Sequence, residues 1–363
     1  MKKELLNIGF IGNFGDEHTI GGQITKTREV LAGILERKGI NNDIIETVQK
    51  KGLQNNDFSN ELYIVDTKGK NLISFFLKTI KAFRNTKNII IMMYTKSYFK
   101  VLPFYIFLNS IYKRNIYEVV TGGTRHEYIK TKELKYEKQI KKIFVESSYM
   151  KKCYNNLGLE NVVYLPNFKK IKPVSETEIY KRDDNILRCC TYSRIDSQKG
   201  IDIAIDVMQK FKKEAGRITL DIIGPVDKEF EKEFNELFQK APDTVRYIGS
   251  IDGNNSSEIL KKYDILLFPT KWKTEGFPGS FIDAMQAGLV ILSTERQNFK
   301  DIIINGVNGW LLPDEYVQGY VDKLQELESN VQLLREMQKR ALLESMKYDR
   351  DIVLKDFLDE IMC

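Results

Sequence analysis

Short apolar runs of strand length alternate with helical patterns along most of this 363-residue chain. In the first half, such runs predict strands at residues 5–11, 43–46, 62–65, 89–93, 116–120 and 143–145. In the second half, they predict strands at residues 186–192, 219–223, 245–248, 265–268 and 290–292. Helices are predicted between them, the first over 22–37 and the last two over 330–363 with a break at 347–349. This alternation is typical of parallel α/β sheets.

The strand pattern lapses between the two series. It stops near Pro166, and the polar, charged stretch that follows contains Pro173, as expected of a linker. The chain is also too long for one ordinary core. We therefore predict two Rossmann-like domains, 1–168 and 185–347, whose parallel sheets face each other across a cleft. Residues 169–184 would form the linker, and 348–363 a C-terminal helix that returns to the first domain.

Two carboxylates eight residues apart flank a Gly/Pro-rich turn in the second half. Glu275 and Asp283 lie on either side of Gly276-Phe277-Pro278-Gly279-Ser280, after an apolar run that ends at Pro269. A strand, a loop with exposed amides and a helix N-terminus together form a place for an anion. A carboxylate on each side can bind hydroxyl groups, so the stretch predicts a sugar joined to a phosphate. For Asp283 the alternative is an early-helix acid that complements the helix dipole.

A basic loop follows the first predicted strand of the second domain. Residues 192–200 read Tyr-Ser-Arg-Ile-Asp-Ser-Gln-Lys-Gly and precede a predicted helix. Ligands of parallel α/β domains bind at the carboxyl ends of the strands. Arg194 offers a planar fork of donors and Lys199 a point charge, which together match a diphosphate. A solvated surface pair is the alternative, but the position after a strand favours phosphate.

The first half carries weaker signals. Its first loop is not G-x-G-x-x-G followed by the expected acidic residue, so an NAD site is not predicted. Gly21 and Gly22 at the mouth of a helix permit close approach of a phosphate, although they could be ordinary turn glycines. The two histidines of the chain, His18 and His126, lie in loops after predicted strands, where a lone histidine is most often incidental.

The composition indicates a soluble globular protein, with 42% hydrophobic residues and four cysteines without metal-binding spacing. Cys189 and Cys190 are adjacent in a predicted strand, which favours core packing and a reducing compartment. The start lacks a signal-peptide pattern and no run is long enough to span a membrane. Asp349-Arg350-Asp351 matches D-x-D, but its place between helices favours capping over metal binding. We expect a cytoplasmic protein.

The net charge of +6 is unevenly distributed. Residues 68–117 contain no Asp or Glu, and aromatic residues are interspersed among the bases. The bases are Lys68, Lys70, Lys78, Lys81, Arg84, Lys87, Lys96, Lys100, Lys113 and Arg114. Basic helices with apolar faces suit an anionic membrane surface, so we expect contact with the inner face of the cell membrane. The alternative is a solvated basic face. Nucleic acid is less favoured because no recognised motif accompanies the charge.

Together, these segments resemble glycosyltransferase family 4, whose members are retaining enzymes of the GT-B fold. Residues 192–200 are similar to that family's basic loop, G/S-R-(4)-K-G, and 275–283 to its E-x7-E motif. Gly21-Gly22 is similar to its N-terminal glycine loop, and Leu165-Pro166-Asn167 fits its domain junction. The resemblance covers nearly the whole chain, is strongest over 186–313, and points to the bacterial surface-polysaccharide type.

The resemblance implies roles for the site residues. Arg194 and Lys199 would hold the donor diphosphate, and Glu275 would contact the hydroxyls of the donor sugar. Asp283, where the family usually has Glu, would bind the ribose hydroxyls with a side chain one methylene shorter. The turn would face the donor through the backbone of Gly276, Phe277, Pro278, Gly279 and Ser280. The Gly122-Gly123 loop would lie opposite the sugar, with Arg125, His126 or Glu127 handling acceptor protons.

The implied function is retaining transfer of a hexosyl group from a nucleotide-diphosphate sugar, expected to be a UDP-sugar, to a glycan or lipid-linked acceptor in surface polysaccharide synthesis. No metal or other cofactor is expected, since Arg194, Lys199 and the helix N-terminus after Pro278 would neutralise the leaving group. A catalytically silent nucleotide-sugar-binding partner of another transferase stays open because of Asp283. A GT-B-fold epimerase is a further alternative, but more acid/base residues would be expected around the sugar.

Overall fold

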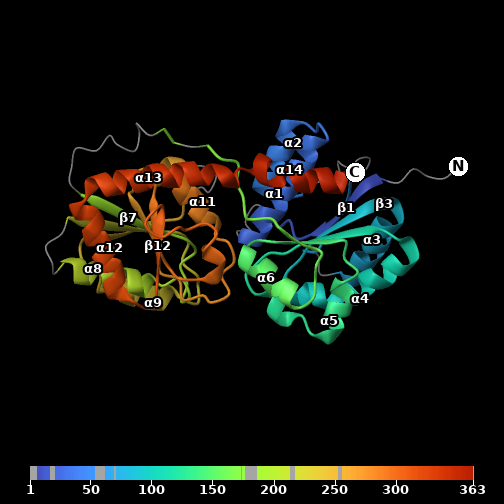
Figure 1. Cartoon of the computed structure of the whole chain (residues 1–363), viewed down its shortest axis with the longest axis horizontal. Coiled ribbons are helices and arrows are strands. Elements are labelled where there is room, and N and C mark those ends of the chain that lie inside the picture. Colours follow the sequence, from blue (N-terminus) through green and yellow to red (C-terminus); the bar gives the residue numbers. More distant parts are fainter. Residues whose placement is uncertain are drawn as a thin grey trace. The chain divides into compact units, whose positions relative to one another are not determined.

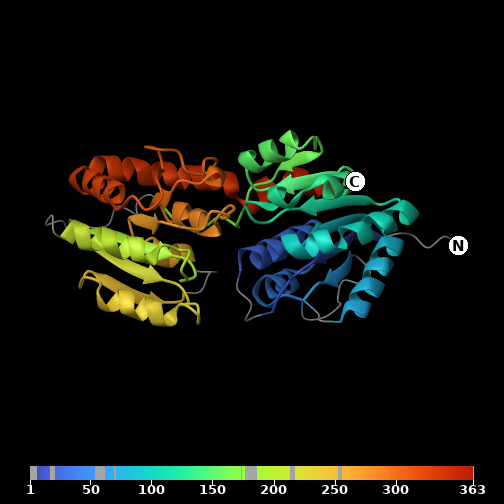
Figure 2. The same ribbon diagram turned by 90° about the horizontal axis from the view of Figure 1, so that it is seen from below.

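The computed structural model describes residues 6–16, 21–53, 62–68, 71–172, 174–175, 186–212, 217–251 and 256–362. The chain divides into two compact units. Unit 1 comprises Met1–Lys169 and Arg350–Cys363, and unit 2 comprises Lys170–Asp349. Each unit contains its own six-stranded parallel sheet with helices on both faces (Figures 1 and 2). The predicted Rossmann-like α/β character of both halves is therefore confirmed.

The sheet of unit 1 has the order β2-β1-β3-β4-β5-β6. Its strands are β1 (Leu6–Gly12), β2 (Leu62–Asp66), β3 (Thr86–Met92), β4 (Asn115–Val119), β5 (Lys142–Val145) and β6 (Val162–Tyr164). In β3, Ile90 packs into the core on one face, whereas Ile89 and Ile91 pack into the core on the other. Such a strand reads as a continuous apolar run because both of its faces are buried.

Helices cover both faces of this sheet. One face is covered by α1 (Gly22–Arg37), α2 (Asn42–Lys51) and α14 (Arg350–Met362). The other is covered by α3 (Leu72–Asn85), α4 (Thr95–Tyr112) and α6 (Ser148–Asn156), with α5 (Thr131–Glu137) beside α4. Gly33 on α1 lets α14 approach closely, because an added Cβ would lie 2.8 Å from Leu354 Cδ1. Arg350 also binds Glu36 of α1, at 2.5 Å.

The predicted strand at 43–46 is wrong, because these residues form part of α2. Asn41 caps this helix by accepting a hydrogen bond from the backbone N–H of Asp43, at 2.8 Å. Ile45 and Val48 are buried on one side of the helix, three residues apart. The short apolar run is therefore one stripe of a helix rather than a strand.

The sheet of unit 2 has the order β12-β11-β10-β7-β8-β9. Its strands are β7 (Leu187–Tyr192), β8 (Ile218–Ile223), β9 (Val245–Gly249), β10 (Ile265–Phe268), β11 (Val290–Thr294) and β12 (Gly309–Leu312). The order reverses at β7, which lies between β8 and β10, and ligands of such sheets bind at the carboxyl ends next to the reversal. Cys189 and Cys190 of β7 are buried on opposite faces, which confirms their expected packing role.

The helices of unit 2 are α8 (Ile201–Lys212), α9 (Glu231–Gln239), α10 (Ser256–Leu260), α11 (Gly279–Gln286), α12 (Val317–Ser329) and α13 (Val331–Ser345). Short 3-10 turns follow β11 at Gln297–Phe299 and α13 at Met346–Tyr348. The second turn confirms the predicted break between the last two helices. Among the described residues, no helix is long and apolar enough to cross a bilayer.

Candidate functional site

Two loops of unit 2 that carry predicted site residues are joined at the carboxyl ends of β7 and β10. The backbone oxygen of Gln198 accepts hydrogen bonds from Lys271 N, at 2.8 Å, and from Thr270 Oγ1, at 3.2 Å. Gly200 closes the first loop with a φ of +68°, and an added Cβ would lie 1.9 Å from the Pro269 oxygen. Only glycine fits there. The structure therefore brings the predicted phosphate loop beside the predicted sugar loop.

Lys199 and Glu275 form an ion pair at this junction. Their side chains are only 9% and 13% exposed. The Lys199 ammonium also lies 4.7 Å from the ring centroid of Trp272 and 5.5 Å from that of Phe268. Aromatic faces attract a cation, so the ammonium is held from two sides. The residues predicted for phosphate and for sugar thus contact each other directly.

Arg194 is held more loosely than Lys199. Its guanidinium binds Asp196 Oδ2 through Nη2, at 3.0 Å, and through Nε, at 3.1 Å, while the Arg194 side chain stays 55% exposed. Asp196 in turn accepts a hydrogen bond from Gln198 N, at 2.9 Å, which stabilises the loop turn. Arg194 is thus an oriented donor fork that remains open to solvent.

The turn after Glu275 is held in place by the side chain of its central residue, Phe277. The ring of Phe277 is buried and packs against Tyr348, with centroids 5.2 Å apart. Gly279 and Ser280 are half-buried and open α11, with Pro278 at the N-cap. Asp283 is 2% exposed, and Gln286 Nε2 donates to its Oδ1 at 3.3 Å. Of the two predicted acids, Glu275 is therefore the more accessible, and the ribose role of Asp283 stays a prediction.

Two residues that the sequence interpretation missed hold the Glu275 loop from β11. Arg296 donates to Thr270 O, at 2.7 Å, and to Trp272 O, at 3.3 Å. Asn298 donates to Glu275 O, at 2.9 Å. Both side chains belong to buried residues, and both follow the carboxyl end of β11. That position was the available signal, since the same strand-end rule had selected Arg194 and Lys199.

The glycine loop of unit 1 leads into α1, which begins at Gly22 as predicted. Gly21 has an extended φ of 173°, and no described atom lies within 4 Å of a Cβ added at Gly21 or Gly22. The local backbone therefore does not itself demand glycine here, and phosphate contact at this loop stays a prediction. His18 lies outside the described residues.

A buried ion pair that the sequence interpretation missed joins α1 to the end of β5. Lys26 Nζ lies 2.9 Å from Glu146 Oε1, and the two side chains are 2% and 6% exposed. Glu146 Oε2 accepts a hydrogen bond from the N–H of Gly122, at 3.2 Å. Gly122 has a φ of +88°, which favours glycine. The pair therefore ties the glycine loop after β4 to the first helix of unit 1.

His126 lies in a 3-10 turn, Arg125–Tyr128, beyond this loop. Burial lowers the pKa of His126, so its imidazole is neutral at neutral pH and can accept a proton. Its Nδ1 is buried and makes no hydrogen bond to the described part of the chain. The neighbouring Arg125 is fully buried in an ion pair with Glu118. The suggestion that Arg125 handles acceptor protons is therefore wrong.

The Arg125–Glu118 pair belongs to a larger buried cluster. The guanidinium lies 4.9 Å from the ring centroid of Tyr98 and donates to the backbone oxygen of Met93. Glu137 is buried beside Glu118, and burial together with that second carboxyl raises the pKa of Glu137 well above its ordinary value. One cation and two carboxyls therefore share this space, which favours the protonated form of Glu137. The cluster fixes the turn that carries His126.

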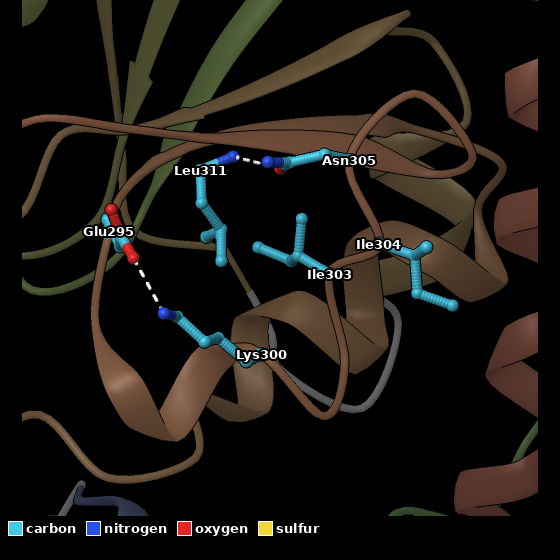
Figure 3. A pocket seen from close by; sticks show the side chains of 6 residues that line it. All are labelled: Glu295, Lys300, Ile303, Ile304, Asn305 and Leu311. Carbon is cyan, nitrogen blue, oxygen red and sulfur yellow. Dashed lines mark hydrogen bonds and ion pairs between the residues drawn. The ribbon is translucent and has the colours of Figure 1, made fainter.

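A separate hollow of about 380 Å³ lies near the β11 and β12 ends of unit 2. Figure 3 shows Ile303 and Leu311 inside it, and the Lys300–Glu295 ion pair, at 2.8 Å, on one side. Asn305 accepts a hydrogen bond from Leu311 N, at 2.8 Å. None of the predicted donor residues lines this hollow. Within the described ranges, no group of three His, Cys, Asp or Glu residues could hold a metal ion.

Known proteins resemble this chain in sequence and in fold. Residues 176–343 match the family model "Glycosyl transferases group 1". The amylovoran biosynthesis glycosyltransferase AmsK of Erwinia amylovora is 28% identical over 132 residues, covering 35% of this chain and 32% of that protein. A glycogen synthase of Pseudomonas aeruginosa is 28% identical over 130 residues, covering 36% and 25%. The chain thus spans a quarter to a third of the length of these curated relatives.

The fold is shared over almost the whole chain. The crystal structure of Anabaena Alr3699/HepE in complex with UDP superposes with a TM-score of 0.76 at 14% identity, covering 98% of this chain and 99% of that one. These matches confirm the resemblance to GT-B glycosyltransferases that the motifs indicated. The narrower assignment to family 4 stays a prediction.

Proposed function

We propose that this chain is a glycosyltransferase that moves a sugar from a nucleotide-diphosphate sugar to a glycan or lipid-linked acceptor in surface polysaccharide synthesis. The observation that carries the proposal is the Lys199–Glu275 junction. It combines a cation for phosphate with a carboxylate for hydroxyl groups, in a frame fixed by Gln198, Arg296 and Asn298. That combination suits a sugar joined to a phosphate.

The proposed chemistry uses the residues of unit 2 to bind and neutralise the leaving group. Negative charge accumulates on the diphosphate as its bond to the anomeric carbon breaks. Lys199, Arg194 and the N-terminus of α11 would stabilise that charge without a metal ion. Glu275 would accept hydrogen bonds from the sugar hydroxyls. The transfer would retain the anomeric configuration, and no residue is assigned as a covalent nucleophile.

Two findings on related proteins support the choice of partners. The Anabaena structural neighbour was solved with UDP and with UDP-glucose, which favours a UDP-sugar as the donor here. AmsK is named for amylovoran biosynthesis, which favours a polysaccharide product. On the acceptor side, His126 is the proposed proton acceptor because burial keeps its imidazole neutral. We place the reaction in the cytoplasm.

Nucleotide binding tests the donor assignment. We expect UDP to raise the melting temperature more than GDP or ADP, since saturation at a hundredfold above Kd adds about 2.7 kcal/mol of stability. Arg194→Ala and Lys199→Ala should lose the response. Lys271→Ala is the matched control, because Lys271 lies on the adjoining loop after β10 but its ammonium pairs with Asp202. No response to any nucleotide would contradict the proposal.

One alternative, a nucleotide-sugar-binding partner without activity of its own, stays open because Asp283 stands where the family usually has Glu. Release of UDP from radiolabelled UDP-sugars, offered with lipid extracts as acceptors, separates the two. A transferase releases UDP and labels the acceptor, and Glu275→Gln abolishes both. A silent partner is stabilised by the donor and releases nothing under any acceptor condition.

A further inference from the structure

Helices α3 and α4 of unit 1 present large apolar side chains to solvent. On α3, Leu72 is 69% exposed, Ile73 75% and Leu77 56%. On α4, Phe107 is 60% exposed and Ile111 57%. We refer to these five residues as the α3/α4 face. A large contiguous apolar patch on a protein surface marks a site that binds another protein, a membrane or a ligand.

The five residues belong to one surface because the two helices adjoin. The rings of Phe76 on α3 and Phe104 on α4 pack edge to face, with centroids 4.9 Å apart. Phe104, Phe107 and Ile111 follow each other at helical spacing, so they form one stripe along α4. Figure 1 shows both helices at the same end of unit 1.

Bases border this face and acids are absent from its helices. Lys100 continues the stripe of Phe104 one turn earlier, and Lys78, Lys81 and Arg84 are exposed on α3. Residues 68–117 contain no acid at all. Two exposed apolar residues outside these helices have a different setting, since Leu343 precedes Glu344 and Ile352 follows Asp351. Neither of them lies in a segment that contains bases and no acid.

We propose that the α3/α4 face docks on the surface of an anionic lipid bilayer, with its apolar side chains among the headgroups and its bases on the lipid phosphates. Amphipathic helices bind in this way without crossing the bilayer. A second copy of the chain is a poor occupant, because two such faces would bring like charges together. The docking is separate from donor binding, since it involves neither Lys199 nor Glu275.

Vesicle co-sedimentation of the full chain tests the docking without any sugar transfer. We expect binding to vesicles that contain phosphatidylglycerol and none to pure phosphatidylcholine. High salt should release the protein, because the screening length falls from about 10 Å at 0.1 M to about 3 Å at 1 M salt. Failure here leaves the nucleotide response intact, so the two proposals fail separately.

Matched variants locate the surface. Leu72→Ser with Leu77→Ser and Phe107→Ser should weaken binding to anionic vesicles, whereas Leu343→Ser with Ile352→Ser should not. A triple variant that removes three bases, Lys81→Gln, Arg84→Gln and Lys100→Gln, should bind anionic vesicles with an affinity about a hundredfold lower. Each base contributes roughly fivefold in affinity near anionic lipid. Lys228→Gln with Lys232→Gln and Lys240→Gln, all exposed in unit 2, form the control. Far-UV circular dichroism checks that each variant is folded.

Several outcomes would overturn the docking. One is equal binding to neutral and anionic vesicles, and another is no binding to either. A third is a loss of vesicle binding in the control variants that is as large as the loss in the α3/α4 variants. Sedimentation velocity supplies an independent check. A dimer that dissociates on Leu77→Ser would assign the face to a second copy of the chain instead of a bilayer.

Discussion

Replacing Lys199 by Met should destabilise unit 2 strongly, although lysine is ordinarily a surface residue. The substitution keeps a long apolar side chain against Trp272 and removes only the charge. The Glu275 side chain, which is 13% exposed, would then lack the cation that now contacts it. The loss should exceed that of a surface ion pair.

The magnitude follows from the burial of the pair. Removing one partner of a fully buried ion pair costs roughly 3–5 kcal/mol. Because a small part of each side chain still meets water, we expect about 2–3 kcal/mol for Lys199→Met. Lys271→Met is the internal comparison, because the Lys271 and Asp202 side chains are 31% and 36% exposed. That pair should contribute less than about 1 kcal/mol.

Urea unfolding followed by tryptophan fluorescence measures the stability of unit 2, where Lys199 and Glu275 lie. The chain has two tryptophans, Trp272 and Trp310, and both lie in unit 2. The transition midpoint should fall at an unchanged slope. Glu275→Gln and the double variant complete a cycle, with an expected coupling of about 1–3 kcal/mol. A Lys199→Met loss no larger than that of Lys271→Met, or a coupling near zero, would refute the reasoning.

Three further predictions concern single positions. Gly200→Ala should cost about 2–4 kcal/mol in the tryptophan transition because φ is +68° and the added Cβ meets backbone, whereas Gly306→Ala, at φ +77° in open space, should cost only about 1–2 kcal/mol. Equal losses would contradict the steric argument. Arg125→Met should cost about 3–5 kcal/mol by leaving Glu118 buried and unpaired, and should shift the far-UV circular dichroism transition more than the tryptophan one. Because the pKa of Glu137 is higher in the native state than in the unfolded state, the native state binds this proton more tightly. The free energy of unfolding should therefore fall as the pH rises above the unfolded-state pKa of a glutamate. Glu137→Gln should make that fall less steep when unfolding is measured as a function of pH.

The sequence was most informative where burial alone determines the local structure. The central strands were found because strands buried on both faces must be apolar throughout. β6 and β12 were missed because each is short and only partly buried, and so leaves a weak apolar pattern. The α2 segment was misread because two adjacent isoleucines look like a strand until the Asn41 cap and the buried i, i+3 spacing are considered.

The site was predictable in its chemistry and less so in its contacts. Strand ends and spacing selected Lys199 and Glu275, but their direct contact spans 76 residues of sequence and depends on how two loops pack. Arg296 and Asn298 bind backbone oxygens, which carry no residue-type signal in the sequence. Lys26 and Glu146 pair through their side chains across 120 residues of sequence, a contact that depends on how α1 packs beside the end of β5.

The Lys199–Glu275 contact also sharpens the proposed function. A diphosphate that binds the Lys199 ammonium competes with the Glu275 carboxylate for the same donors. Binding of the nucleotide part would therefore release Glu275 to accept hydrogen bonds from the sugar hydroxyls, so that recognition of phosphate and of sugar would be linked. On this reasoning, saturating UDP should reduce the coupling energy measured in the Lys199→Met and Glu275→Gln cycle. A coupling that stays unchanged under saturating UDP would mean that Lys199 stabilises the loop and does not bind the diphosphate.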